Sequence, residues 1–171
     1  MITHPIAKIN LGLNVVERRP DGYHNLQTVF YPVPIKDVLK VEPRSKSRAE
    51  EPDCTLAVSN IQIEGDVQRN LVVRAYQLLK EDFPTLPPVE ASLEKNIPTQ
   101  AGMGGGSSDC AFMIRLLNEL FQLKLSDTKM MEYAARLGAD CAFFVLSRPC
   151  YAEGIGEQLQ PISLDLSEWY I

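Results

Sequence analysis

A glycine-rich segment in the middle of the chain constrains its fold more than any other feature. Residues 98–109 read Pro-Thr-Gln-Ala-Gly-Met-Gly-Gly-Gly-Ser-Ser-Asp, and an apolar helical pattern follows over residues 110–121. Glycines let backbone N–H groups turn toward a ligand, and the start of a helix adds unpaired N–H groups and a positive dipole end. The segment is therefore predicted to be a loop that binds phosphate.

Glycine-rich turns also occur as plain connectors between elements. Three consecutive glycines each cost roughly 0.5–1 kcal/mol relative to alanine in regular structure, which favours phosphate binding over a connector. The segment is not a Walker loop, because no lysine follows its last glycine before Ser107. Its glycine spacing also differs from the dinucleotide-binding fingerprint. A third kind of phosphate loop is indicated.

Length and charge narrow the class of protein. A chain of 171 residues is sufficient for one domain, or for one domain and a fragment of another. A net charge of −5 argues against a nucleic-acid partner, which normally meets a basic face. The sequence contains no apolar run approaching the ~20 residues that cross a bilayer, and its N-terminus lacks a signal-peptide pattern. The sequence predicts a cytoplasmic protein with no membrane partner.

The chain has four cysteines and two histidines, and the cysteines show no Cys-x-x-Cys spacing. A disulfide framework or a zinc site is therefore disfavoured. The cysteines are predicted to be reduced, mostly buried, small apolar residues. No metal-ligating residues are predicted.

Alternation of apolar and polar residues predicts a strand over residues 5–17. Lys8 and Asn10 fall on the same side of this strand. A surface position is the ordinary expectation for a lysine. The adjacent polar pair raises the alternative that this face lines a site.

A Pro-Asp-Gly turn at residues 20–22 follows this strand. Tyr23 and His24 come directly after it. They could cap a hairpin, or they could stack on and hydrogen-bond to a flat ligand.

Further elements follow from periodicity and turn residues. Strands are predicted at residues 25–33, 37–42, 53–58, 60–64 and 89–94, a helix from Asn70 to before Phe83, a second over 126–136, and a hairpin over 149–162. Arg44 to Glu51 is typical of a mobile loop, and residues 168–171 are typical of a strand cut in mid-course. Asp140 lies in an apolar neighbourhood, where a carboxylate is either a helix cap or a paired catalytic group.

Several segments together resemble a known family. Residues 98–108 are similar to the ATP loop of the GHMP kinases, which phosphorylate small molecules. Residues 7–13, 21–26, 137–140 and 152–157 resemble the branch of this family that phosphorylates the 2-hydroxyl of a cytidyl-linked methylerythritol. The resemblance implies an α+β fold, namely the N-terminal domain of GHMP kinases, which is related to domain 2 of ribosomal protein S5.

The resemblance also implies roles for individual residues. Asp140 matches the general base and Lys8 the lysine that pairs with it, while Asn10, Tyr23 and His24 match substrate-binding positions. The ATP-binding positions are Asn70, Lys95, Pro98, Thr99, Gln100, Ala101, Gly102, Met103, Gly104, Gly105, Gly106, Ser107 and Ser108. The implied cofactors are ATP and Mg²⁺, and the implied partner is a small-molecule substrate.

The resemblance finally implies a division of the chain. Residues 1–160 would form the ATP-binding domain, and residues 161–171 would begin a C-terminal domain that the chain lacks. Such a chain is expected to be weakly active or inactive by itself. The alternatives are another GHMP small-molecule kinase and a non-catalytic binding module of the same shape.

Overall fold

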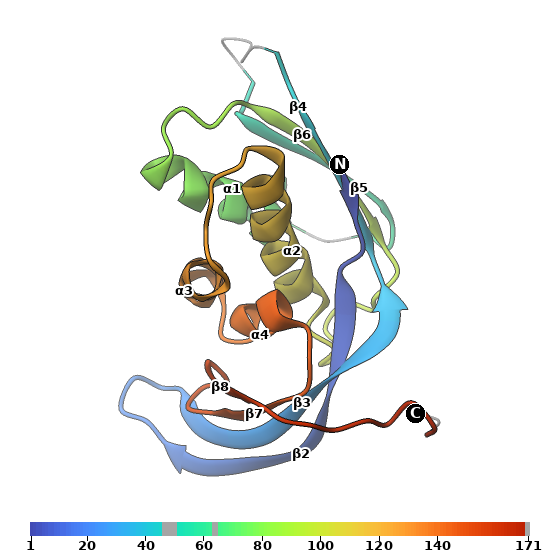
Figure 1. Cartoon of the computed structure of the whole chain (residues 1–171), viewed down its shortest axis with the longest axis vertical. Helices are drawn as coiled ribbons and strands as arrows, with labels where there is room; N and C mark the ends of the chain where they lie inside the picture. Colours follow the sequence, from blue (N-terminus) through green and yellow to red (C-terminus); the bar gives the residue numbers. More distant parts are fainter. Residues whose placement is uncertain (46–50, 63–64, 170–171) are drawn as a thin grey trace.

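Two four-stranded sheets and a group of helices make up the fold (Figure 1). The computed structural model describes residues 1–45, 51–62 and 65–169. The strands are β1 (Ile2–Thr3), β2 (Ile6–Arg18), β3 (His24–Lys36), β4 (Val38–Pro43), β5 (Cys54–Asn60), β6 (Val89–Lys95), β7 (Cys150–Glu153) and β8 (Gln158–Pro161). The helices are α1 (Leu71–Asp82), α2 (Gly105–Leu120), α3 (Asp127–Leu137) and α4 (Cys141–Leu146), with a 3₁₀ turn, η1, at Val67–Arg69. The predicted mixture of helices and strands is confirmed.

The first sheet has the strand order β1-β4-β6-β5, and the second has the order β2-β3-β7-β8. All pairings are antiparallel except that of β5 with β6. The chain passes directly between the sheets at two neighbouring points, namely between β1 and β2 and at Asp37 between β3 and β4, and it returns to the second sheet through α2, α3 and α4, between β6 and β7. The two direct crossings are joined because the Asp37 N–H donates to the Pro5 carbonyl at 2.9 Å.

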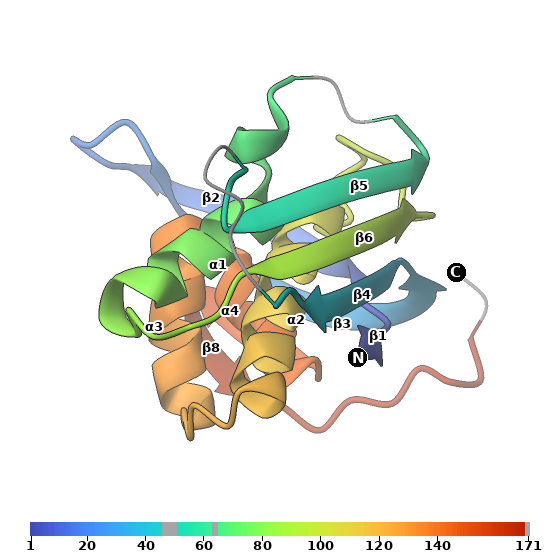
Figure 2. The same cartoon turned by 90° about the horizontal axis from the view of Figure 1, so that it is seen from above.

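The helices pack against both sheets and enclose the core. Seen from above, α1 and α2 lie beneath β5 and β6 (Figure 2), while α4 lies over β7 and β3 (Figure 1). Phe30 of β3 and Phe143 of α4 join the second sheet to the helices, with ring centroids 5.2 Å apart. All four cysteines are buried free thiols, as predicted. Within the described residues, no helix has both the length and the apolar character needed to cross a bilayer.

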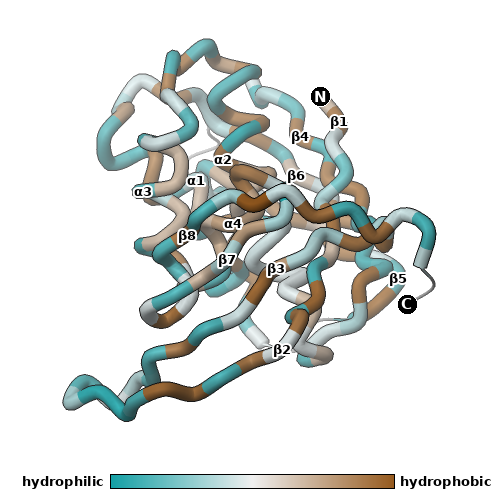
Figure 3. The backbone as a smooth tube through the Cα atoms, turned by 60° about the horizontal axis from the view of Figure 1, so that its bottom comes forward, coloured by the Kyte–Doolittle hydropathy of each residue, from teal (hydrophilic) through white to brown (hydrophobic). Residues whose placement is uncertain are grey.

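The long β2–β3 hairpin extends beyond the packed part of the molecule (Figure 3). Its outer half exposes apolar side chains of β2, with Leu13, Val15 and Val16 each more than half exposed. The predicted alternation is interrupted here, because the register shifts between Leu11 and Leu13. Gly12 lies at this shift with φ of 70°, a left-handed conformation that glycine adopts without a steric penalty.

Several predicted boundaries are wrong. Helix α2 begins at Gly105, five residues earlier than the pattern indicated. Of the strand predicted over 60–64, only Asn60 is in a strand and it belongs to β5, while residues 63–64 lie outside the described residues. Residues 168–169 form a turn and bend instead of a strand, and residues 170–171 lie outside the described residues. Residues 46–50 of the predicted loop also lie outside them.

Candidate active site

A cavity of about 430 Å³ lies over the glycine-rich segment. Its lining comes from the ends of η1, α1, β6 and α2. The lining residues are Arg69, Asn70, Leu71, Lys95, Pro98, Thr99, Gln100, Ala101, Gly102, Met103, Gly104, Gly105, Gly106, Ser107 and Asp109. All predicted ATP-binding residues except Ser108 are therefore brought together around one hollow, whereas the side chain of Ser108 is wholly buried.

The N-terminus of α2 forms one wall of this cavity. The first intrahelical hydrogen bond runs from the Ser108 N–H to the Gly104 carbonyl at 2.8 Å. The preceding helical N–H groups lack intrahelical acceptors, so they can donate to an anion. Gly104 lies at the N-cap with φ of 68° and ψ of 20°. The glycines thus belong partly to the helix itself and partly to the turn before it.

Asn70 has a structural role at the same cavity. Its Oδ1 accepts a hydrogen bond from the Val72 N–H at 2.9 Å, which caps the start of α1. An asparagine at this position satisfies one of the unpaired N–H groups of the first helical turn. The predicted cap is confirmed, and the same residue lines the cavity, while its contact with a nucleotide stays a prediction.

Lys95 lies beneath the start of α2 in a buried cluster of charges. Its ammonium contacts Asp37 and is 2.8 Å from Oδ2 of Asp109, and each of the three side chains is at most 3% exposed. Asp37 also accepts hydrogen bonds from the backbone N–H groups of Asn96 and Ile97, at 2.5 and 2.8 Å. Neither carboxylate was predicted from the sequence to belong to the site. The alternating burial of β6 was the available signal, because it places Lys95 on the buried face, where an ammonium needs a carboxylate partner.

Lys8 and Asp140 lie together, as the sequence analysis required. Lys8 Nζ is 3.3 Å from Asp140 Oδ2, with the side chain of Lys8 6% exposed and that of Asp140 33% exposed. Asp140 occupies the N-cap position of α4, but its side chain makes no capping hydrogen bond. Of the two alternatives for this carboxylate, the structure supports the paired group. The pair remains partly open to solvent through Asp140, so a substrate hydroxyl can reach the carboxylate.

Backbone and glycine contacts join this ion pair to the glycine-rich loop and to the turn between β7 and β8. The Lys8 N–H donates to the Met103 carbonyl at 3.0 Å, so β2 is hydrogen-bonded directly to the loop. A Cβ atom on Gly104 would lie 3.3 Å from Lys8 Cγ, and one on Gly156 would lie 3.3 Å from Asp140 Oδ1. Elements distant in the sequence therefore converge on one site.

Asn10 holds the Lys8 ammonium, and Thr28 in turn holds the Asn10 side chain. Lys8 Nζ donates to Asn10 Oδ1 at 2.5 Å, and Asn10 Nδ2 donates to Thr28 Oγ1 at 3.1 Å. Lys8 Nζ also lies 4.8 Å from the centroid of the Phe30 ring. The contact of Thr28 with Asn10 was not predicted from the sequence, since it depends on how β2 pairs with β3.

Tyr23 and His24 lie away from this pair, at the tip of the β2–β3 hairpin. Both are exposed. His24 is six residues from Phe30 along β3, which corresponds to roughly 20 Å at the usual rise of a strand. A single ligand that contacts both groups must be elongated.

Comparisons with known proteins show which proteins this chain is similar to. A model of the GHMP kinases N terminal domain matches residues 70–148. The 4-diphosphocytidyl-2-C-methyl-D-erythritol kinase of Bacteroides fragilis is 53% identical over 171 residues, which is 100% of this chain and 61% of that enzyme. The Parabacteroides distasonis enzyme of the same name is 42% identical over 171 residues and is covered to 60%. The chain thus spans about three fifths of the length of these relatives.

Solved structures show the same fold. A crystal structure of 4-(cytidine 5'-diphospho)-2C-methyl-D-erythritol kinase matches with a TM-score of 0.79 and 39% identity, covering 96% of this chain and 56% of that chain. Mevalonate kinase from Methanococcus jannaschii matches with a TM-score of 0.68 and 12% identity, covering 98% of this chain and 57% of that chain, which is a likeness of fold alone. The chain therefore contains the N-terminal domain of the GHMP kinases, which the family model matches over residues 70–148 and which the fold shares.

Proposed function

We propose that the protein transfers the γ-phosphoryl group of ATP to the 2-hydroxyl of 4-diphosphocytidyl-2-C-methyl-D-erythritol, a step toward isoprenoid precursors. The observation that carries the proposal is the Lys8–Asp140 pair, at 3.3 Å, joined by the Lys8 N–H to the glycine-rich loop. The names of relatives at 53% and 42% identity support this choice of acceptor.

The chemistry of the pair suits phosphoryl transfer to an alcohol. An alcohol is a weak nucleophile at neutral pH, and a carboxylate within reach of its proton acts as a general base. Asp140 takes that role in our proposal, while the positive ammonium of Lys8 stabilises the negative charge that develops on the reacting oxygens. The backbone N–H groups at the start of α2 would bind the phosphates.

Mg²⁺ would enter this site together with the nucleotide. The described residues contain no group of three or more His, Cys, Asp or Glu side chains that could hold a metal ion. Mg²⁺ usually keeps several waters and binds through substrate phosphates instead of a dedicated protein cage. When bound with the nucleotide, Mg²⁺ would supply positive charge that offsets the charge of the phosphates.

Release of ADP by the full-length protein tests the proposed reaction. We expect turnover with ATP, Mg²⁺ and 4-diphosphocytidyl-2-C-methyl-D-erythritol, and only background release with mevalonate, homoserine or galactose. Turnover with one of the last three acceptors instead would assign the chain to another branch of the GHMP kinases. The proposal would be contradicted if none of the four acceptors stimulated ADP release, or if the protein did not bind ATP.

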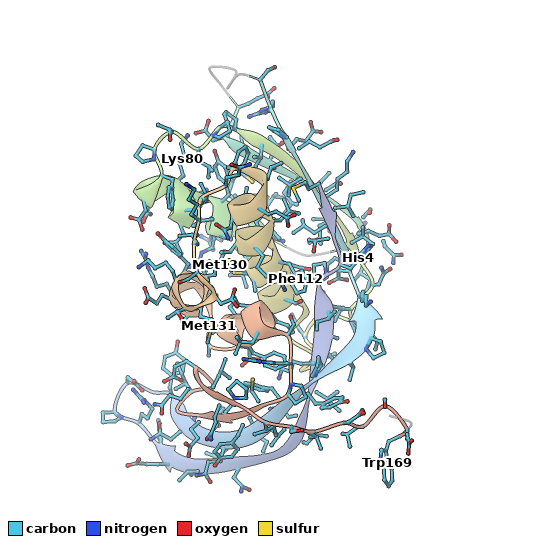
Figure 4. All side chains as sticks on the ribbon, in the orientation of Figure 1. His4, Lys80, Phe112, Met130, Met131 and Trp169 are labelled. Carbon is cyan, nitrogen blue, oxygen red and sulfur yellow. The ribbon has the colours of Figure 1, made fainter. Side chains whose placement is uncertain are left out.

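His24→Ala tests the predicted contact with the acceptor. We expect the KM for the cytidyl substrate to rise about tenfold, since one lost stacking or hydrogen-bonding contact is worth about 1.4 kcal/mol, while the KM for ATP is unchanged. His4→Ala is the matched control, because His4 is exposed beside the first sheet, far from the β2–β3 tip (Figure 4). Equal effects of the two substitutions would remove His24 from the substrate site.

The remaining expectations from the sequence stay predictions. Tyr23 and Asn10 are proposed to contact the same substrate as His24, and the division of the chain at residue 160 is proposed on the family resemblance. Residues 162–169, beyond β8, run as an extended segment with a final turn, from which Trp169 projects (Figure 4). The cytoplasmic location is likewise a proposal.

A further inference from the structure

The charges beneath the phosphate loop are unequal in number. Lys95 supplies one ammonium, and Asp37 and Asp109 supply two carboxyl groups, all within a buried cluster. One ammonium can balance one carboxylate, so the second carboxylate is a buried charge without full compensation. The cluster lies next to the cavity, because a Cβ atom on Gly105 would be only 3.1 Å from Lys95 Nζ.

The two carboxyl groups differ in how well they are held. Both oxygens of Asp37 have partners: Oδ2 contacts Lys95, and Oδ1 accepts two backbone N–H groups. Asp109 Oδ2 contacts Lys95, but its Oδ1 is buried and has no hydrogen-bond partner among the described residues. Asp109 also lines the cavity, together with Lys95. Asp37 is thus the fixed partner of Lys95, and Asp109 is the weakly held one.

We infer that Asp109 is an exchangeable partner of Lys95, which releases the ammonium to a phosphate of bound ATP and takes up a proton from solvent as it does so. The inference rests on the proposed ATP binding and assigns Asp109 as a positioning residue. No covalent bond to the nucleotide is made or broken. The proton comes from the buffer and ends on the carboxylate of Asp109.

The electrostatics of the cluster favour this exchange. Burial raises the pKa of Asp109 to about 7, Lys95 opposes the rise, and Asp37 adds to it. The Cys110 thiol, on the same helix, is a further titratable neighbour, whose pKa is raised first by its hydrogen bond with Cys141 and by burial, with a smaller contribution from Asp109. Polyphosphate in the cavity would add negative charge and would raise the pKa of Asp109 further. ATP binding should therefore take up a proton near neutral pH and weaken as the pH rises.

The affinity of the full-length protein for MgATP at pH 6 and pH 8 tests the inference. With a free-state pKa near 7, Asp109 is mostly protonated at pH 6 and mostly ionised at pH 8. We expect the Kd for MgATP to rise up to about tenfold between these pH values. The reason is that, one pH unit above the pKa, only about one tenth of the Asp109 side chains carry the proton that the bound state requires. Calorimetry of wild type at pH 7.5, in buffers of different ionisation enthalpy, should report net proton uptake.

Asp109→Asn separates this role from a purely structural one. We expect the variant to bind MgATP at pH 8 about as tightly as the wild type does at pH 6, with no pH dependence and no proton uptake. If Asp109 had only a structural role, the variant would bind MgATP more weakly at both pH values, and its Kd would change with pH as that of the wild type does. Glu94→Gln is the matched control, since it removes an exposed carboxylate from the neighbouring position of β6 and should keep the wild-type slope.

The outcomes are distinct from those of the proposed function. Absence of MgATP binding would overturn the proposed function and this inference together. MgATP binding without proton uptake in the wild type, or with equal Kd at pH 6 and 8, would overturn only the inference. The wild-type measurements decide it even if Asp109→Asn fails to fold. Weaker binding by a folded Asp109→Asn variant would also overturn it.

Discussion

Asp140→Asn is expected to lower kcat for phosphoryl transfer by about 10²–10⁴-fold, the usual contribution of a positioned general base. The substitution keeps the size of the side chain but removes its ability to accept a proton from the substrate hydroxyl. Because Asp140 makes no capping hydrogen bond and is one third exposed, the fold should be preserved. The KM for ATP should change little, since Asp140 does not line the nucleotide cavity.

Two further variants make this result specific. Asp127→Asn, at the exposed start of α3, is the control and should keep wild-type turnover. Lys8→Met should also lose turnover, and the double variant with Asp140→Asn should lose little more than either single one, because groups that act as a unit are not additive. Undiminished turnover of Asp140→Asn, measured as ADP release with the cytidyl substrate, would remove the assigned base.

Local patterns in the sequence predicted most of the elements. Alternation found β2 and β6, and the asparagine cap followed by an apolar stripe found α1 at Asn70. These patterns succeed because they depend on neighbours within one or two turns of chain. The Lys8–Asp140 pair, in contrast, came from the family resemblance, since its members are far apart in the sequence and no local pattern joins them.

The missed features depend on contacts between distant segments. Asp37 has an ordinary place between two strands, and only the fold shows that it lies at the crossing between sheets and contacts Lys95. Helix α2 begins at Gly105 in spite of the low helix propensity of glycine, at a position where a Cβ atom would lie 3.0 Å from Ile97 Cγ2 and 3.1 Å from Lys95 Nζ. These features depend on tertiary contacts, so local sequence propensity could not predict them.

Gly104→Ala is expected to destabilise the protein and to reduce turnover severely, although the change adds only one methyl group. A Cβ atom at this position would lie 2.6 Å from Phe144 Cζ and 3.3 Å from Lys8 Cγ. The backbone φ of 68° adds a further cost, since left-handed geometry costs an alanine about 1–2 kcal/mol. Overpacking of this kind typically costs about 1–3 kcal/mol more.

The expected loss of turnover follows from what surrounds the added methyl group. Phe144 lies on α4, four residues after Asp140, so its displacement moves the helix that carries the base, and a shift of Lys8 moves its partner. Gly106→Ala is the matched control for stability alone, because its nearest atom would be Leu71 Cδ1 at 3.9 Å and its backbone is helical, whereas its place in the cavity lining rules it out as a control for turnover. Urea unfolding should separate the two variants, and the ADP release of Gly104→Ala is compared with that of the wild type. Equal stability of the two variants would show that the close approach of Gly104 to Phe144 is not required. The expected coupling of the glycine-rich loop to the Lys8–Asp140 pair would then be contradicted as well.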